Sequence, residues 1–390
     1  AIGYDAMTTN TAGGTYNIAI GNYALDALTS GDYNIVVGGG AGTAINTGSD
    51  NTIYGYLAGN ALTSGSDNVA LGSTSLYTAT TTSGNTAVGS NALKLTTGDS
   101  NTAIGRQAME DNSTGSNNVA VGMEAMLQNT TGGDNTAIGY GSLENNTTGT
   151  SNVAVGRDAL EATTGNANVG VGHQAGKANT SGQIIAIGYQ TMQSNTTGTR
   201  NIAIGGNAYD SSDTENDNLA IGHNAMTANT AGGTKNVAIG NYSLDVLTSG
   251  DDNVAVGYIS LSANTTGSNN TALGSWSLTA NTTGVSNTAV GTDSMDSNTD
   301  GNYNVAVGAD ALQANSTGHR NVAIGHTALN DNTVSDNIGI GQQAGYSITT
   351  GTRNIAIGTN ALDDTDTEND NLAIGYNAMT TNTAGGIQNV

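Results

Sequence analysis

The sequence predicts an all-β protein, a parallel β-solenoid (β-roll) built from coils of about 17 residues. Three observations predict this fold. A short phrase, Asn-x-Ala-(Ile/Val)-Gly, returns along the whole chain; its β-branched residues alternate with alanine, as in a strand; and turns rich in Gly, Asn and Thr separate the phrases. A helical repeat is excluded, because glycine and β-branched residues dominate and the apolar residues do not recur at spacings of three and four.

The period is visible in the stretch NTAIGYGSLENNTTGTSNVAVG, where residues 135–139 and 152–156 are nearly the same phrase. The glycines that close the first phrases are Gly3, Gly21, Gly38, Gly55, Gly72, Gly89, Gly105, Gly122, Gly139 and Gly156. A unit this short can hold two short strands and two turns, and it is too small to fold alone. We therefore expect each repeat to be one coil, with stacked coils sharing strand hydrogen bonds and a continuous core.

Each part of a coil has its own signal. In the phrase at 152–156, strand periodicity leads us to expect that Val153 and Val155 face the coil interior and that Ala154 faces away. The closing Gly156 permits a corner with positive φ. Leu160 and the small residue before it then form the opposite wall, and the Asn-Thr-Thr-Gly stretch that follows in most coils is typical of a return turn.

Asparagine precedes the strand in almost every coil, as at Asn17, Asn34, Asn51, Asn68 and Asn85, with Ile184 as the clear exception. Side-chain amides at equal heights can hydrogen-bond to one another, so we predict an asparagine ladder along the stack. Four coils replace the large wall residue with glycine, and the sequence alone gives no account of what fills the wall there. These positions are Gly42, Gly59, Gly176 and Gly345.

A longer repetition overlies the short one. Residues 199–226 return almost unchanged at 352–379, and residues 373–386 return to 1–14. Neither end of the sequence shows the atypical coil that caps a solenoid. We therefore expect residues 1–390 to form a single continuous repeat solenoid, a window of a longer fibre.

Composition limits the partners. Eight Lys and Arg face 31 Asp and Glu, for a net charge of −23, so the basic stripe that tracks phosphates is missing and nucleic acid is not an expected partner. The chain has no cysteine for disulfides or thiolate metal sites. It also lacks the run of about 18 apolar residues that a membrane span requires, so we expect no membrane insertion.

Chemistry-bearing motifs are weak. The strings at 170–176 and 339–345 look like dinucleotide loops, but no helix is predicted after them, so we interpret them as coil corners. The histidines, three of which directly follow a strand glycine, are predicted to be solvent-facing; they are His173, His223, His319 and His326. No Ser/His/Asp grouping repeats. We expect no catalytic, cofactor-binding or metal site, and no enzymatic activity.

The sequence also contains candidate sites of two other kinds, for calcium binding and for N-glycosylation. Asp213 and Asp217 lie in the richest acidic turn and are the first candidates for calcium, but the glycine-aspartate nonapeptide of calcium β-rolls is absent. We therefore predict stability that does not depend on calcium. The tripeptides at 129–131 and 146–148 match the N-glycosylation acceptor, although turn chemistry explains them equally well.

The phrase Asn-x-Ala-Ile-Gly-x-x-Ala resembles the head repeats of trimeric autotransporter adhesins, which form parallel β-rolls in threefold bundles. It is still more similar to the Asn-Thr-Ala-Ile-Gly-x-x-Ala-Leu-x-x-Asn-Thr-Thr-Gly repeats of phage and prophage tail-fibre proteins. The resemblance covers essentially the whole chain. It implies a homotrimeric extracellular fibre, on a cell surface or a virion, that carries a host- or surface-binding tip outside this segment.

Three functions follow as alternatives: a structural fibre shaft, a glycan-binding surface along the rod, and an ice-binding solenoid. Ice binding needs an uninterrupted threonine array, whereas these turns mix Thr with other residues, so we favour the shaft. We expect the middle alanines of the strands, such as Ala137 and Ala154, to face outward and pack against neighbouring chains; the alternative is that alanine suits a tight coil. Exposed aromatic residues, including Trp276 and Tyr258, are expected to pack between chains rather than bind glycans.

Overall fold

The computed structural model describes residues 1–363 and 367–380. The chain divides into two compact units, Ala1–Thr197 and Gly198–Val390, which are described separately. Within the described ranges every named element is a three-residue β-strand, and there is no helix.

The first unit contains β1 (Ile18–Ile20), β2 (Ile35–Val37), β3 (Thr52–Tyr54), β4 (Val69–Leu71), β5 (Thr86–Val88), β6 (Thr102–Ile104), β7 (Val119–Val121), β8 (Thr136–Ile138), β9 (Val153–Val155), β10 (Val169–Val171) and β11 (Ile185–Ile187). The second contains β12 (Ile202–Ile204), β13 (Leu219–Ile221), β14 (Val237–Ile239), β15 (Val254–Val256), β16 (Thr271–Leu273), β17 (Thr288–Val290), β18 (Val305–Val307), β19 (Val322–Ile324), β20 (Ile338–Ile340), β21 (Ile355–Ile357) and β22 (Leu372–Ile374).

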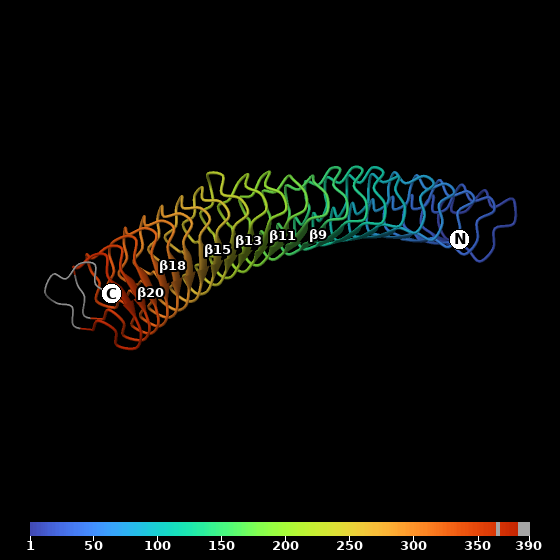
Figure 1. The fold of residues 1–390 in the computed structure, drawn as a ribbon. Coiled ribbons are helices and arrows are strands. Elements are labelled where there is room, and N and C mark those ends of the chain that lie inside the picture. Colours follow the sequence, from blue (N-terminus) through green and yellow to red (C-terminus); the bar gives the residue numbers. More distant parts are fainter. Residues whose placement is uncertain (364–366, 381–390) are drawn as a thin grey trace. The chain divides into compact units, whose positions relative to one another are not determined.

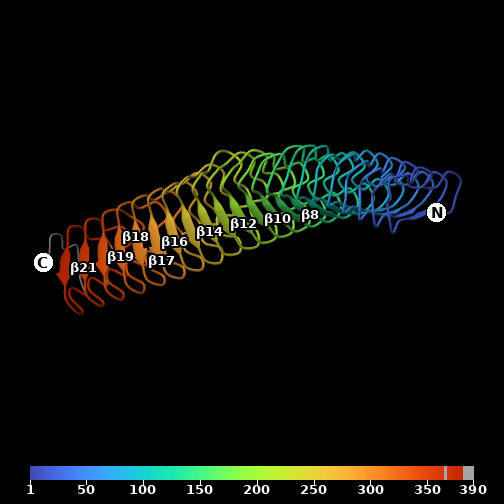
Figure 2. The ribbon, with the colours of Figure 1, turned by 90° about the vertical axis from the view of Figure 1, so that its right-hand side faces the viewer.

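Each strand pairs in parallel with the strand of the next coil, and equivalent residues lie opposite one another. Thr136, for example, lies opposite Val153, and Ala137 lies opposite Ala154. Pairing of this kind runs from β1 to β11 in the first unit and from β12 to β22 in the second. Figures 1 and 2 show the strands lined up on one side of the coils in each unit. The predicted parallel β-solenoid of about 17-residue coils is thus confirmed.

The corner after each strand depends on glycine. Gly156 has φ 134°, and a Cβ there would lie 2.4 Å from the carbonyl oxygen of Gly172 in the next coil. The wall residue Leu160 then adopts a left-handed conformation, with φ 50°. Each described coil thus closes around a single three-residue strand, not the two short strands that the repeat length led us to expect.

The direction of the strand side chains is the reverse of our prediction. Ala154 is fully buried, whereas Val153 is 37% exposed and Val155 is partly exposed; the equivalent Ile138 is 41% exposed. Every strand has this pattern, with a buried middle residue between two exposed or half-buried ones. The reason is the buried asparagine ladder: Asn152 points inward, so two-residue alternation turns Ala154 inward as well.

The opposite wall is as predicted, because Ala159 and Leu160 are both fully buried. In two of the glycine coils the missing volume is supplied from within the coil. A Cβ on Gly42 would touch Ile45 and Val36, and a Cβ on Gly59 would touch Ile53. The middle strand residue is therefore larger in these coils, where alanine is the rule elsewhere.

In the other two glycine coils, side chains of neighbouring coils fill part of the missing volume, and for Gly345 the side chain of Ile348 in the same coil contributes as well. A Cβ on Gly176 would lie 2.7 Å from Leu160 and 3.2 Å from Ile184, and a Cβ on Gly345 would meet Leu329 and Ile348. Ile184, the exception in the asparagine ladder, is thus one of the side chains that fill this gap. Its backbone N–H still donates to Oδ1 of the preceding ladder residue at 3.1 Å.

The predicted asparagine ladder is confirmed. Nδ2 and the backbone N–H of Asn152 both donate to Oδ1 of Asn135, at 3.1 and 2.9 Å, and Asn152 Nδ2 also donates to the carbonyl oxygen of Gly165 at 2.9 Å. Both side chains are buried. The side-chain amide of Asn152 therefore links its strand to the return turn of the same coil and to the ladder asparagine of the preceding coil.

Candidate functional site: the exposed sheet face and its edges

The first and third residues of the strands form an exposed face on each unit, which we call the sheet face. The third residue is Ile, Val or Leu in every strand except β3, where it is Tyr54, and the first is Ile, Val, Leu or Thr. Several members are more than one third exposed, including Ile104 at 41%, Leu273 at 47% and Ile324 at 40%. None of these positions is charged. The sheet face is therefore an apolar band with one regular spacing.

This band replaces the alanine stripe that the sequence led us to expect as the outer packing surface. The middle alanines, such as Ala137 and Ala154, are fully buried inside the coils and cannot meet another chain. The alternative reading, that alanine suits a tight coil, is correct. Threonine occupies only some first positions and no third position, so the band also lacks the uninterrupted threonine array of an ice-binding surface.

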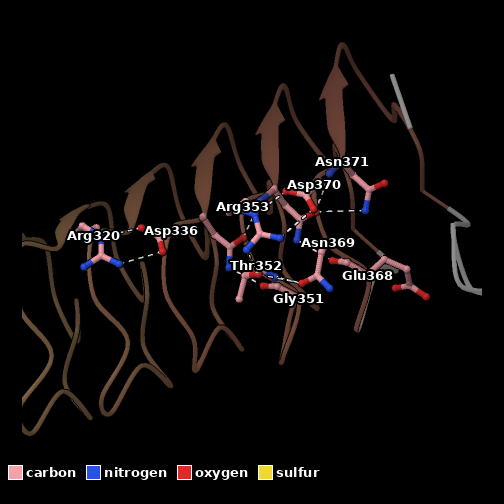
Figure 3. Close-up of polar contacts among 11 residues, drawn as sticks. Arg320, Asp336, Gly351, Thr352, Arg353, Glu368, Asn369, Asp370 and Asn371 are labelled. Atoms are coloured by element: carbon pink, nitrogen blue, oxygen red, sulfur yellow. Dashed lines mark hydrogen bonds and ion pairs between the residues drawn. The ribbon is translucent and has the colours of Figure 1, made fainter. Parts of the chain in front are cut away.

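One edge of the sheet face carries charge. The residue before each ladder asparagine has a left-handed backbone, and in four successive coils of the second unit these residues are Arg320, Asp336, Arg353 and Asp370. Arg320 Nε donates to Asp336 at 2.7 Å, and Arg353 Nε and Nη2 donate to Asp370 at 2.6 and 2.8 Å (Figure 3). The hydrogen bond from Arg353 holds the pKa of Asp370 below its usual value.

Of the two calcium candidates, Asp217 belongs to the same edge, whereas Asp213 lies earlier in the chain, at an exposed position of the return turn. Arg200 Nε and Nη2 donate to the two carboxylate oxygens of Asp217 at 2.6 and 2.7 Å, and this bond lowers the pKa of Asp217. Lys235 lowers it further. Both oxygens of Asp217 thus have a cationic partner. Among the residues that the structure describes, no three His, Cys, Asp or Glu side chains gather into a group that could hold a metal ion.

The histidines are separated. His223 and His326 follow strand glycines and are exposed, as predicted, whereas His173 at the equivalent position is half-buried, with its Nδ1 buried. His319 lies in a turn, and its Nδ1 accepts a hydrogen bond from the backbone N–H of Asn302 at 2.9 Å. The strings at 170–176 and 339–345 are ordinary coils, with Gly170 in the middle of β10.

A second asparagine ladder was not predicted. Nδ2 of Asn129 donates to Oδ1 of Asn112 at 2.6 Å, and Nδ2 of Asn146 donates to Oδ1 of Asn129 at 3.3 Å. These are the asparagines of the two glycosylation tripeptides, and both are fully buried. The folded chain therefore does not offer them for glycosylation, and the turn interpretation holds. The sequence signal that could have predicted this second ladder is the regular position of its asparagines, three residues after the large wall residue.

The other edge of the sheet face, directly after the strand glycines, carries aromatic side chains. Tyr4, Tyr140, Tyr189, Tyr258 and Trp276 are between 40% and 65% exposed. Their outward placement agrees with the prediction that they lie in variable surface positions.

The chain matches no protein-family model and no curated protein. The part of the chain that the structure describes contains no helix with the length and hydropathy needed to cross a membrane.

Proposed function

We propose that this protein is the structural shaft of an extracellular fibre, formed by three identical chains that pack through their sheet faces. The observation that carries the proposal is the uncharged apolar band that each unit leaves exposed. The fibre is a phage tail fibre or a surface adhesin, and it projects a tip that binds a host or another surface through a glycan or receptor. It has no enzymatic activity.

An exposed apolar band of this extent needs a covering partner. Monomeric proteins rarely leave large contiguous apolar patches in water, and burying exposed Ile, Val and Leu side chains is favourable by roughly 25 cal/mol per Å². The strongest candidate is another copy of the chain. The apolar side chains of the band recur at the same spacing from coil to coil, and a second copy of the chain carries the same side chains at the same spacing.

The number of chains rests on the resemblance to trimeric adhesin heads, which supports a closed threefold arrangement. The acidic net charge of −23 supports separate, hydrated fibres, because such surfaces repel one another. Nucleic acid is a poor partner, since Arg200, Arg320 and Arg353 are already paired with aspartates.

Cysteine crosslinking tests the arrangement directly, because the chain has no native cysteine. Val153→Cys places a thiol on the sheet face, and Thr148→Cys places one on an exposed return turn as a matched control. With a short-armed tris-maleimide, we expect Val153→Cys to give a three-chain product and Thr148→Cys to remain a single chain on denaturing gels. A single chain from both variants, or the same product from both, would contradict packing through the sheet face.

A further inference from the structure

Four aromatic side chains follow one another along the corner after the strands of the second unit. His223, Tyr242, Tyr258 and Trp276 belong to consecutive coils, after β13, β14, β15 and β16. Their ring centroids are 5.7, 6.3 and 5.7 Å apart, and successive rings meet edge to face, at interplanar angles of 85°, 84° and 76°. We call these four residues the aromatic ladder.

The edge-to-face geometry leaves ring faces open. In each edge-to-face contact one ring contributes only its edge, so the contact covers a face of the other ring alone. A face-to-face stack would cover a face of both rings. The ladder is also accessible to solvent, since Tyr258 is 46% and Trp276 41% exposed. It therefore presents apolar ring surface in single file, one ring wide.

The spacing along the ladder is regular. His223 and Tyr258 are the first residues after a strand glycine, and Tyr242 and Trp276 are the second, so equivalent positions recur every two coils. At about 4.8 Å between strands, this repeat is roughly 10 Å. Two pyranose units of an extended glycan have a closely similar length, and the C–H-bearing face of a pyranose ring packs well on an aromatic face.

Polar groups beside the rings suit a sugar. Asn241 and Ser275 lie between the aromatic positions, and the Asn241 Oδ1 accepts from the backbone N–H of His223 at 2.9 Å. The structure gives the Trp276 indole N–H no partner among the described residues, so it is available to donate to a hydroxyl. The first two positions after the strand glycine carry no carboxylate in these four coils, and a chain of net charge −23 disfavours an anionic ligand.

We propose that the aromatic ladder binds a neutral, extended glycan chain that lies parallel to the stack of coils. This proposal departs from the sequence-based expectation that Tyr258 and Trp276 pack between chains, because the edge-to-face geometry leaves their ring faces open. This site is distinct from the sheet face and from any binding tip. It does not require the chain to be trimeric, so its failure and the failure of the shaft proposal are separately detectable.

Trp276 is the only tryptophan of the chain, so its fluorescence reports this site alone. The experiment titrates the full chain with neutral hexasaccharides, namely cellohexaose, xylohexaose and mannohexaose, and with hexagalacturonate as an anionic probe. We expect at least one neutral hexasaccharide to change the Trp276 emission saturably, with no comparable change from hexagalacturonate or free glucose.

Two variants within the ladder and one control variant locate the site. Tyr258→Ala should weaken binding on the order of tenfold, the loss expected for one aromatic contact. Tyr303→Ala removes a tyrosine of 61% exposure on the opposite edge of the same unit and should leave binding unchanged. His223→Gln provides a second variant within the ladder and should also weaken binding.

Three outcomes would overturn the proposal. The first is that no neutral hexasaccharide changes the emission. The second is equal affinity in Tyr258→Ala, His223→Gln and Tyr303→Ala. The third is an emission that follows protein concentration instead of sugar concentration, which would make the ladder a contact between chains.

Discussion

Alanine in the middle of the strand sets the width of the coil. Ala137 is fully buried between Ala120 and Ala154 of the neighbouring strands, and the wall residue of the same coil, Leu143, is also fully buried. A larger middle residue occurs in β2 and β3, whose coils have glycine in the wall. In these two coils the larger middle residue compensates for the missing wall side chain, so the interior stays filled.

Enlarging this residue should destabilise the chain. Ala137→Leu adds methylenes to a filled interior, and we expect a loss of about 1–3 kcal/mol in the free energy of unfolding. The control is Ile138→Leu, next to it in β8 but 41% exposed, which should change stability far less. Guanidinium unfolding midpoints of the two variants provide the comparison, and equal losses would contradict the observed side-chain direction.

The ladder amide is the second residue on which the coil depends. Asn135 Oδ1 accepts from the backbone N–H and Nδ2 of Asn152, and its Nδ2 donates to the Gly149 carbonyl at 2.8 Å. Asn135→Ala leaves these buried groups without a partner, so we expect a loss of at least about 2 kcal/mol and faster hydrogen exchange at the Asn152 amide. Asp134→Asn, at the exposed neighbouring position, is the control and should have little effect, because asparagine tolerates the left-handed backbone there as aspartate does.

The direction of the strand was within reach of the sequence. Asn152 and Ala154 are two residues apart, so an inward-pointing ladder requires an inward-pointing alanine. Val153 and Val155 have a strong preference for strands, but this preference does not require burial, because β-branched residues also suit a half-exposed pleated surface. The second ladder was harder to predict, because Asn129 before Thr-Thr-Gly fits a turn as well as a buried amide.

At the scale of the coil, the period and its parts were predictable because every element has a local signal. The filling of the wall at Gly42 and Gly176 was not predictable. The side chains that fill it, such as Val36 and Leu160, are distant within the coil or belong to the preceding coil. Such compensation depends on side-chain contacts between coils. Those contacts have no fixed spacing in the sequence.

The charged edge links successive coils and should respond to acid. Asp217, Asp336 and Asp370 have pKa values below the usual 3.8, in each case chiefly because an arginine donates a hydrogen bond to the carboxylate. A lowered folded-state pKa stabilises the fold above the unfolded pKa, and this contribution disappears as pH falls through the lowered value.

We therefore expect the melting temperature to fall as pH is lowered from about 4 towards about 2, with a smaller fall at high salt because these pairs are exposed. Asp370→Asn should reduce this acid dependence. Asp67→Asn is the control and should not reduce it, because the neighbours of Asp67 on this edge, Asp50 and Gly84, carry no positive charge. Identical pH profiles for the two variants would show that the Arg353–Asp370 pair does not link the coils.

At the scale of the whole molecule, stability is distributed over many similar coils in each unit. The amide ladder and the alanine interior recur throughout, whereas the acidic turns do not. We therefore predict that EDTA leaves the melting temperature unchanged. A fall of many degrees, reversed by added calcium, would show that an acidic turn such as 213–217 binds the ion after all.

Assembly of three chains through their sheet faces can be measured as the mass of the purified chain in solution by sedimentation equilibrium. The comparison is a variant that carries Ile104→Asp, Ile138→Asp and Ile324→Asp on the sheet face. We expect about three times the 38.7 kDa chain mass for the native protein and a folded single chain for the variant. A stable 38.7 kDa monomer of the native chain, with its apolar band exposed to water, would contradict this assembly.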